Sequence, residues 1–264
     1  MPLYALKHKI GALNWGRDIH MSARIKAFLV HGLVSIIIAL LSMGLVYFIW
    51  YPAPLAVATG VMHIFLLMLC IDVVIGPLLT LLVYKTGKKT LKLDLTIICL
   101  LQLAALTYGL FTVYQGKPAW LVYNADRFDL VRINEIDLRK VEKALPEYQN
   151  VSFLFPNWVA AVPPKNVNER NAITFEAVFS GVDVAQRPEL YVDLGQAKKQ
   201  IQSHVIALKE LDKYNAKMDV TQILAQYPEA TGFVPLKANA LDMTVLINKE
   251  KGEVVKIVDL RPWK

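Results

Sequence analysis

The sequence lacks charge over two long stretches. No Asp, Glu, Lys or Arg occurs between Lys26 and Asp72, and none occurs between Asp94 and Lys117. A water-soluble fold cannot bury that much uncharged chain rich in Leu, Ile and Val, whereas a bilayer core of about 30 Å requires about 20 such residues per helix. The first part of the chain is therefore predicted to lie in a membrane, and a purely soluble protein is excluded.

Cysteine is also scarce. The two cysteines, Cys70 and Cys99, fall within the predicted membrane region, and residues 117–264 contain none. The charged part of the chain must therefore be stabilised by its apolar core without disulfides, which its length permits. The chain also has no Gly-x-Ser-x-Gly, His-Glu-x-x-His or Cys-x-x-Cys motif, so the hydrolase, metalloprotease and redox classes that use them are not indicated.

Three membrane spans are predicted, over about residues 28–50, 56–84 and 95–114. Each is long enough to cross a bilayer, and the second is long enough to tilt or kink. Aromatic rings favour the headgroup zone and so mark the span ends. The aromatic residues found there are Tyr47, Phe48, Trp50, Tyr51, Tyr84, Tyr114 and Trp120. The predicted fold class is a membrane protein with three transmembrane α-helices in residues 28–116, followed by a mixed α+β domain in residues 117–264.

Basic residues predict the orientation of these spans. The positive-inside rule assigns basic loops to the cytoplasm. The basic residues before the first span and between the second and third are Lys7, Lys9, Arg17, Arg24, Lys26, Lys85, Lys88, Lys89 and Lys92, and the loop at 51–55 has none. We therefore expect a multi-pass membrane protein with a cytoplasmic N-terminus and a C-terminal domain on the outside face, which in a Gram-negative cell is the periplasm.

The formal net charge of +7 follows from this topology signal. Residues 117–264 contain twenty basic and nineteen acidic side chains, so the C-terminal domain is nearly neutral. A nucleic-acid-binding domain would concentrate basic side chains there. The excess charge is thus expected to face anionic lipid, and no nucleic-acid partner is predicted.

Residues 1–27 are expected to form a cytoplasmic N-terminal segment. The run Met21-Ser22-Ala23-Arg24-Ile25-Lys26 is typical of a short basic start, so one interpretation is that the true start is Met21. The other is that residues 1–20 are an amphipathic cytoplasmic lead-in. The apolar stretch of the first span exceeds the 7–15 residues usual for a signal peptide, and no cleavage site follows Trp50, so an uncleaved anchor is preferred.

Alternating and helical patterns predict a mixed domain after the third span. Hairpins are expected over 119–133 and 243–258, the second closed by Gly252 in a left-handed conformation. Helices are expected over 137–145, 168–179, 194–214 and 220–227, and apolar residues at helical spacing make 194–214 the strongest of them. Within 168–179, the residues expected to face inward are Ile173, Ala177 and Phe179.

The candidate site within the membrane is Asp72 with Gly76 and Pro77. An ionisable residue in the middle of a span costs about 2.5–3.5 kcal/mol on insertion scales, so it is a functional hypothesis by default. Gly76 and Pro77 favour a kink in the same helix. Three interpretations remain open: a structural role for a neutral or hydrogen-bonded Asp72, contact with a partner helix, and a proton or ion path.

Other candidate sites are weaker. His31 and His63 lie in spans, but without paired spacing they are interpreted as interior histidines rather than metal ligands of Asp72. Gly87-Lys88-Lys89-Thr90 lacks the upstream glycine of a phosphate loop. His204 is the only histidine after residue 117 and is interpreted as a surface residue. No catalytic constellation is found, so no enzyme activity, metal or cofactor is predicted.

Five short blocks carry a resemblance to a known family. They are Met21-Ser22-Ala23-Arg24-Ile25-Lys26-Ala27-Phe28, Asp72-Val73-Val74-Ile75-Gly76-Pro77-Leu78-Leu79-Thr80-Leu81, Tyr123-Asn124-Ala125-Asp126-Arg127-Phe128-Asp129-Leu130-Val131, Gly181-Val182-Asp183-Val184-Ala185-Gln186-Arg187-Pro188 and Val258-Asp259-Leu260-Arg261-Pro262-Trp263. Their order and positions over residues 21–264 resemble the TfpX/TfpZ family of type IV pilin accessory proteins. Residues 1–20 depart from the family.

The resemblance implies an inner-membrane accessory protein that stabilises a cognate type IV pilin or aids its assembly into the pilus. The expected partners are the lipid bilayer and both parts of that pilin, its membrane helix and its periplasmic head. The family has no established active site, so the resemblance carries over no catalytic residue. The alternative from another functional class is a membrane-anchored periplasmic sensor or binding domain, which the short cytoplasmic segments do not favour.

Overall fold

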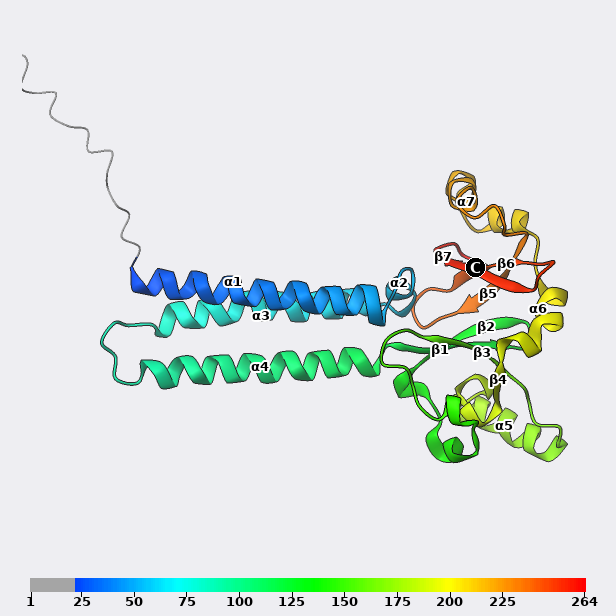
Figure 1. Ribbon diagram of the computed structural model, residues 1–264, viewed down its shortest axis with the longest axis horizontal. Helices are drawn as coiled ribbons and strands as arrows, with labels where there is room; N and C mark the ends of the chain where they lie inside the picture. The colour runs from blue at the N-terminus through cyan, green and yellow to red at the C-terminus, as the bar shows by residue number, and fades with distance from the viewer. Residues whose placement is uncertain (1–21) are drawn as a thin grey trace, which may run out of the picture.

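The computed structural model describes residues 22–264. The predictions for residues 1–20 and for a start at Met21 lie outside this range. The described chain has two parts, which we call the three-helix bundle and the sheet domain (residues 117–264) (Figure 1). The predicted fold class, three long apolar helices followed by a mixed α and β domain, is confirmed.

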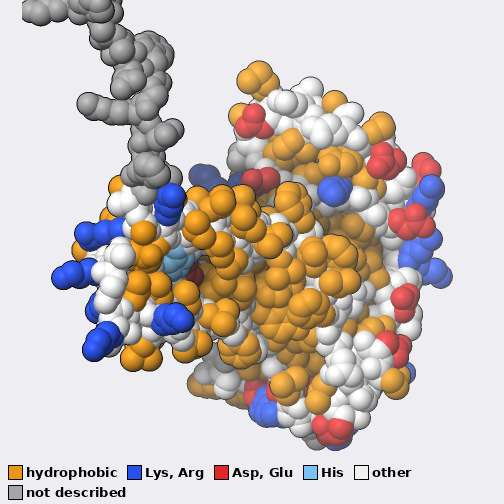
Figure 2. Space-filling view, turned by 60° about the vertical axis from the view of Figure 1, so that its left-hand side comes forward, with side chains coloured by type: hydrophobic (Ala, Val, Ile, Leu, Met, Phe, Trp, Pro, Cys, Tyr) orange, Lys and Arg blue, Asp and Glu red, His pale blue; other side chains and the backbone are white. Residues whose placement is uncertain are grey.

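The three-helix bundle consists of α1 (Ala23–Gly44), α3 (Val61–Val83) and α4 (Leu91–Gln115). A π-helical turn, Leu45–Trp50, continues α1. Each helix is long and apolar enough to cross a membrane. A helix satisfies its backbone hydrogen bonds internally, as a hydrocarbon surrounding requires. Figure 2 shows hydrophobic side chains over the bundle and Lys and Arg side chains gathered toward its free end.

The second predicted span begins later than expected. The structure forms a separate short helix, α2 (Leu55–Thr59), and Gly60 then adopts a left-handed conformation with φ of 71° before α3 begins. Leu55 and Ala58 are buried in the core of the sheet domain. The backbone oxygen of Ala58 accepts a hydrogen bond from the amide of Ala240 at 2.9 Å. The start predicted at residue 56 is therefore wrong, because tertiary contacts hold this apolar segment against the sheet.

One seven-stranded sheet organises the sheet domain, with strand order β4-β3-β1-β2-β5-β6-β7. Neighbouring strands are antiparallel except for two parallel pairs, β1 with β3 and β2 with β5. The strands are β1 (Pro118–Asn124), β2 (Arg127–Arg132), β3 (Asn157–Ala161), β4 (Tyr191–Asp193), β5 (Gly232–Lys237), β6 (Met243–Asn248) and β7 (Glu253–Val258).

Both predicted hairpins are confirmed. β1 pairs with β2 across a tight turn in which Ala125 has a positive φ of 59°, and β6 pairs with β7 across a turn that contains Gly252. Gly252 adopts the expected left-handed conformation, with φ of 63°. A Cβ atom there would also come too close to α6 (Lys198–His204). Glycine is therefore favoured both by the backbone conformation of the turn and by the lack of space for a side chain.

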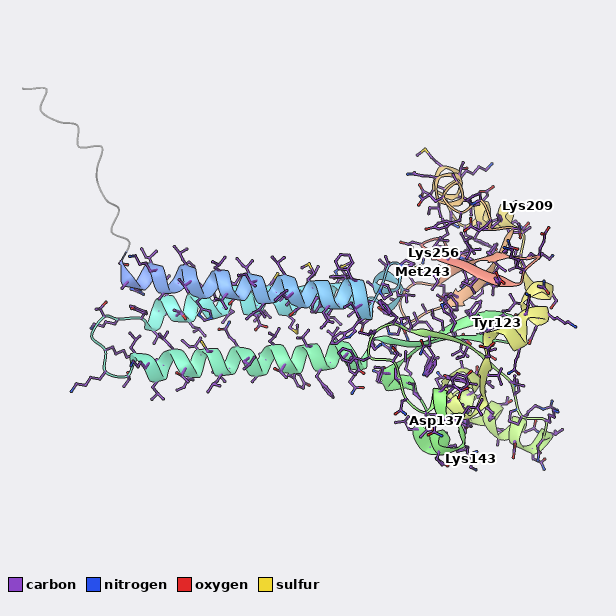
Figure 3. All side chains as sticks on the ribbon, viewed as in Figure 1. Tyr123, Asp137, Lys143, Lys209, Met243 and Lys256 are labelled. Carbon is purple, nitrogen blue, oxygen red and sulfur yellow. The ribbon has the colours of Figure 1, made fainter. Side chains whose placement is uncertain are left out.

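Alternating side chains bury both faces of the sheet. On one face, Tyr123 and Met243 join the core that α2 and α6 cover. On the other face, Trp120 packs against the short 3₁₀ turns within residues 133–148 and 184–190, and Phe233 packs against α7 (Lys217–Leu224). In Figure 3, Tyr123 lies on β1 and Met243 at the start of β6, whereas Lys143 and Lys209 lie on outer turns.

The long helix predicted over 194–214 is wrong. The chain forms a 3₁₀ turn at Leu194–Ala197, then α6, and then a second 3₁₀ turn at Leu208–Lys213. Between α6 and the second turn, Ile206 exchanges backbone hydrogen bonds of 2.8 and 2.9 Å with Phe233 on β5. This bridge to the sheet interrupts a segment whose apolar spacing favours a helix.

The other predicted helices differ in detail. α5 (Val167–Ser180) is confirmed and ends at Gly181 in a left-handed conformation. Ile173 and Ala177 are partly buried as expected, but Phe179 is exposed, so its inward orientation was wrong. Residues 137–145 form a 3₁₀ segment that is kinked at Lys140 rather than a helix.

Candidate helix-binding groove in the three-helix bundle

α3 is the central helix of the bundle, and α1 and α4 each pack along it. The α1–α3 contact is close where Gly32 faces the ring of Pro77. Near this point, the Nδ1 atom of His31 lies 2.6 Å from the hydroxyl oxygen of Thr80, a hydrogen-bond distance. The small residue lets the two backbones approach, and the polar pair links them, as is typical of helices packed in a membrane.

The α3–α4 contact also depends on small residues. A Cβ atom on Gly76 would collide with the amide of Gln102, and one on Gly109 would collide with the Sδ atom of Met68. Each glycine therefore receives a long side chain from the opposite helix. Gln102 uses this position to donate a hydrogen bond from Nε2 to the backbone oxygen of Asp72 at 2.9 Å.

Asp72 lies in the middle of α3 and faces a groove between α1 and α4. The groove has a volume of about 290 Å³. Its lining residues are His31, Val34, Ser35, Ile38, Ala39, Leu69, Asp72, Cys99, Gln102, Leu103 and Leu106. Two buried oxygens, Oδ2 of Asp72 and Oε1 of Gln102, have no hydrogen-bond partner within residues 22–264. The groove is thus mostly apolar, and two of its lining residues carry a buried oxygen without a hydrogen-bond partner.

A second groove on the bundle differs from the groove of Asp72 because only apolar residues line it. It lies between α1 and α3, and its lining residues are Phe28, Leu29, Gly32, Leu33, Ile36, Val73, Val74, Pro77 and Leu78. All of these side chains are apolar, so lipid chains satisfy them without any hydrogen bond. Polar atoms distinguish the groove of Asp72 from this one.

The structure separates the three predicted site residues. Gly76 and Pro77 are buried in contacts within the bundle, with α4 and α1 respectively, whereas Asp72 lines the groove. Sequence reasoning did not assign Gln102 to this site. The available signal was that Gln102 is the one amide side chain in an uncharged span, but only the helix register brings it to Asp72.

The three histidines among the described residues also lie in different surroundings. His31 makes the Thr80 contact and lines the groove, which agrees with an interior role. His63 is exposed on the surface of α3, so its interpretation as an interior residue was wrong. His204 is exposed at the end of α6, as predicted.

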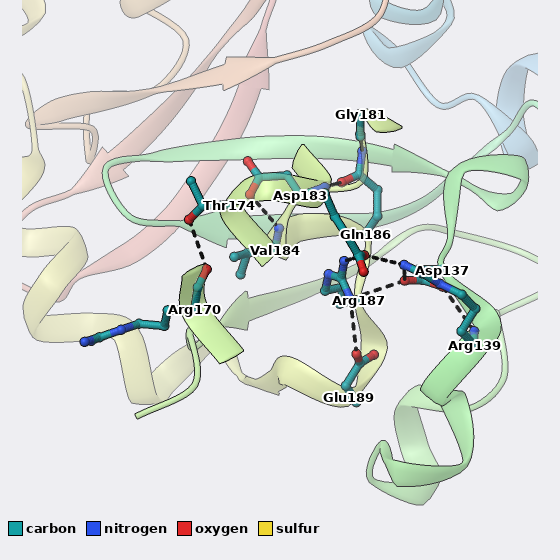
Figure 4. Close-up of polar contacts among 11 residues, drawn as sticks. Asp137, Arg139, Arg170, Thr174, Gly181, Asp183, Val184, Gln186, Arg187 and Glu189 are labelled. Atoms are coloured by element: carbon teal, nitrogen blue, oxygen red, sulfur yellow. Dashed lines mark hydrogen bonds and ion pairs between the residues drawn. The ribbon is translucent and has the colours of Figure 1, made fainter. Parts of the chain in front are cut away.

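The sheet domain contains a polar cluster that the sequence did not reveal. The guanidinium of Arg187 is almost fully buried and pairs with the carboxylates of Asp137 at 3.4 Å and Glu189 at 3.9 Å (Figure 4). It also pairs with a third carboxylate, that of Glu176 in α5. Arg139 also binds Asp137 and Glu176, at 2.7 and 2.6 Å. Its hydrogen bonds hold the pKa of the Asp137 carboxyl below its usual value.

These contacts assign a structural role to the cluster. α5 has no fully buried side chain, so the ion pairs of Glu176 tie it to the rest of the sheet domain. The Asp183 side chain accepts a hydrogen bond from the amide of Val184, and the Asp183 amide donates to the side chain of Gln186 (Figure 4). The cluster thus fixes the loop that follows α5.

Comparisons with known proteins find similarity to fimbrial assembly proteins. A family described as "Fimbrial assembly protein FimB" matches residues 19–60. Two fimbrial assembly proteins of Dichelobacter nodosus, of serogroups E1 and I, are each 31% identical over 229 residues, which covers 83% of this chain and 89% of theirs. A third, of serogroups C1 and C2, is 32% identical over 117 residues, 44% of this chain and 89% of its own. No solved structure matches the chain.

Proposed function

Because this chain belongs to the family of fimbrial assembly proteins, we propose that it is an accessory protein of the inner membrane that stabilises a cognate type IV pilin and aids its assembly. The names of its relatives support a role in pilus assembly. The resemblance to the TfpX/TfpZ family supports a pilin as the client. The proposed role is non-catalytic: the protein binds the pilin and releases it unchanged.

The groove at Asp72 is the observation that carries this proposal. A pilin that awaits assembly has an apolar helix in the bilayer and a globular head outside it, as the family resemblance implies. We propose that the pilin helix lies in the groove between α1 and α4. Side chains from α1, α3 and α4 line the groove, among them Asp72 and Gln102, and each of these two carries a buried oxygen without a hydrogen-bond partner within residues 22–264.

The connection between the two parts of the protein supports simultaneous binding of helix and head. α2 is buried against the sheet while its neighbours α1 and α3 form the bundle, and Gly116 alone separates α4 from Lys117. The sheet domain is therefore held close to the end of the bundle. Two modest contacts with one pilin then strengthen each other through effective concentration.

The proposed orientation places the N-terminus and the Lys88 loop in the cytoplasm and the sheet domain in the periplasm. The basic side chains at the free end of the bundle support it. An alkaline phosphatase fusion at Lys264 should be active, and the same enzyme fused within the Lys88 loop should be inactive. The reverse pattern of activities would overturn the orientation.

A clean deletion tests the function. We expect the level or surface assembly of the cognate pilin to fall several-fold, while an unrelated pilin expressed in the same cells stays unchanged. Re-expression of the full chain should restore the cognate pilin. Normal pilin abundance and normal piliation in the deletion strain would contradict the proposal. A signalling protein in place of pilin among the co-purified partners would favour the membrane-anchored sensor instead.

A further inference from the structure

A short segment before β3 exposes three large apolar side chains in succession. Phe153, Leu154 and Phe155 are 57%, 48% and 49% exposed. No charged residue occurs between Glu147 and Lys165, so this segment has no charged rim of its own. Contiguous apolar surface of this kind is unusual where a protein meets water, and it marks a contact with a partner or a membrane.

The position of the segment identifies the side of the molecule on which that contact lies. The ring of Phe153 packs against Trp50 and Tyr114, with centroid distances of 5.9 and 5.6 Å. Trp50 ends the π-helical turn after α1, and Tyr114 lies in the last turn of α4. The segment therefore adjoins the end of the bundle, where aromatic side chains mark the boundary between hydrocarbon and water.

Exposed apolar side chains also lie on the helices near this end of the bundle. Phe48 in the π-helical turn is 78% exposed, and Phe111, one turn before Tyr114 on α4, is 56% exposed. These two rings face the surroundings of the bundle close to its end. Phe153, which contacts Trp50 and Tyr114, adds a further exposed apolar side chain at this end of the bundle.

Lys117 fixes the backbone of the segment. Its ammonium donates hydrogen bonds to the backbone oxygens of Ser152 at 2.8 Å and Leu154 at 3.4 Å. The Lys117 side chain is fully buried and also lies over the ring of Tyr114, 5.8 Å from its centroid. Because the carbonyls turn inward to the lysine, the three apolar side chains stay outside on an ordered backbone.

We propose that Phe153, Leu154 and Phe155 insert into the headgroup zone of the lipid leaflet on the side of the sheet domain. The occupant of this surface is lipid, because the segment adjoins the lipid-facing surface of the bundle and carries no charge. Aromatic and aliphatic side chains next to a buried cation are suited to this zone, where one end is apolar and the other is hydrated. The segment then acts as a fourth membrane contact that fixes the tilt of the sheet domain over the bilayer.

A fluorescent probe in purified protein tests this insertion without any pilin, so its result is independent of the proposed function. In a background with Cys70→Ser and Cys99→Ser, a single cysteine replaces Leu154 and is labelled with an NBD dye in phospholipid nanodiscs. We expect blue-shifted emission that lipids with a nitroxide near the headgroup quench at least twofold. The matched control is Glu250→Cys in the β6–β7 turn, which should emit as in water and resist quenching.

A second labelled position, Phe155→Cys, guards against a local defect at Leu154. Each labelled protein should elute as the unlabelled chain does from a sizing column, which checks that it is folded. Water-like emission at both positions would overturn the proposal. Blue-shifted emission that nitroxide lipids do not quench would also overturn it, because the segment would then be covered by protein.

Discussion

Gln102 on α4 occupies the space that Gly76 on α3 leaves free. A Cβ atom on Gly76 would collide with the Gln102 amide, and that same amide donates to the backbone oxygen of Asp72. The relationship joins the packing of two helices to the position of the acidic residue. Gly76, assigned from the sequence to the candidate site with Asp72, therefore contacts another helix of the same chain rather than lining the groove.

Replacing Gly76 by alanine should displace Gln102 and break its hydrogen bond to Asp72. Such bonds between helices in a membrane are worth about 0.6–2 kcal/mol, so we expect a loss of stability of that order. The measurement is the thermal unfolding of the purified chain in detergent. Gly44→Ala on α1 is the matched control, since a Cβ atom there meets nothing within 4 Å. Equal melting temperatures for the two variants would contradict the role of this contact.

Asp72→Asn and Asp72→Leu separate hydrogen bonding from charge. Asparagine keeps the shape and a polar side chain, whereas leucine removes both polarity and charge. If Asp72 offers a hydrogen bond to a pilin helix in the groove, Asn should retain most pilin co-purification and Leu should reduce it several-fold.

The assay compares pilin level and pull-down at matched expression of the two Asp72 variants. If neither variant retains pilin co-purification, Asp72 must supply a charge or a proton. Wild-type behaviour of the Leu variant would remove Asp72 from the site altogether.

Arg187→Met should destabilise the sheet domain strongly. The substitution leaves Asp137, Glu189 and Glu176 without their buried cation, and breaking a buried ion pair costs about 3–5 kcal/mol. Lys213→Met is the control, because Lys213 is 62% exposed and its pair with Glu210 lies at the surface, where such pairs contribute about 0–1 kcal/mol. Denaturant unfolding, followed by the fluorescence of the sheet domain, measures both changes. Similar losses for the two variants would contradict a special role for Arg187.

Lys117 should make stability depend on pH in the alkaline range. Burial lowers the pKa of its ammonium from 10.5 to about 8 in the folded protein. Between these two values the unfolded chain binds the proton that the folded protein has lost, so the free energy of unfolding should rise as the pH increases from about 8 to about 10.5. Below about pH 8 both states carry the proton, and this group contributes no slope.

Lys117→Met tests the assignment because methionine fills the space without titrating. The variant should lose the alkaline increase in the free energy of unfolding, while Lys213→Met should keep it. The measurement is urea unfolding at several pH values across that window. Parallel curves for the wild type and Lys117→Met would show that the lysine does not titrate as proposed.

Features that depend on a short window of sequence were predictable. The hydrocarbon core requires uncharged helices of a set length, so the two charge-free stretches determined three long apolar helices. The turn at Gly252 and the alternating residues around it determined the last hairpin in the same way. In the candidate site, Asp72 stood out because it is an acid within an apolar span.

Contacts between distant residues were decided by the tertiary structure. The apolar spacing over 194–214 favours one helix, but the bridge from Ile206 to Phe233 breaks it. Residues 55–59 have the hydropathy of a span, yet they pack against the sheet. Hydropathy and periodicity measure the structural preference of a local segment. They do not include its contacts with residues that are distant in the sequence.

The sequence by itself thus determined the membrane character, the order of the two parts and the position of one intramembrane acid. Only the tertiary structure decided that Gln102 meets Asp72, that Arg187 gathers three carboxylates and that Lys117 holds the Ser152–Phe155 segment at the end of the bundle. The physical reason is that solvation by hydrocarbon acts on each segment separately. Pairing of buried polar groups, in contrast, depends on helix register and strand order.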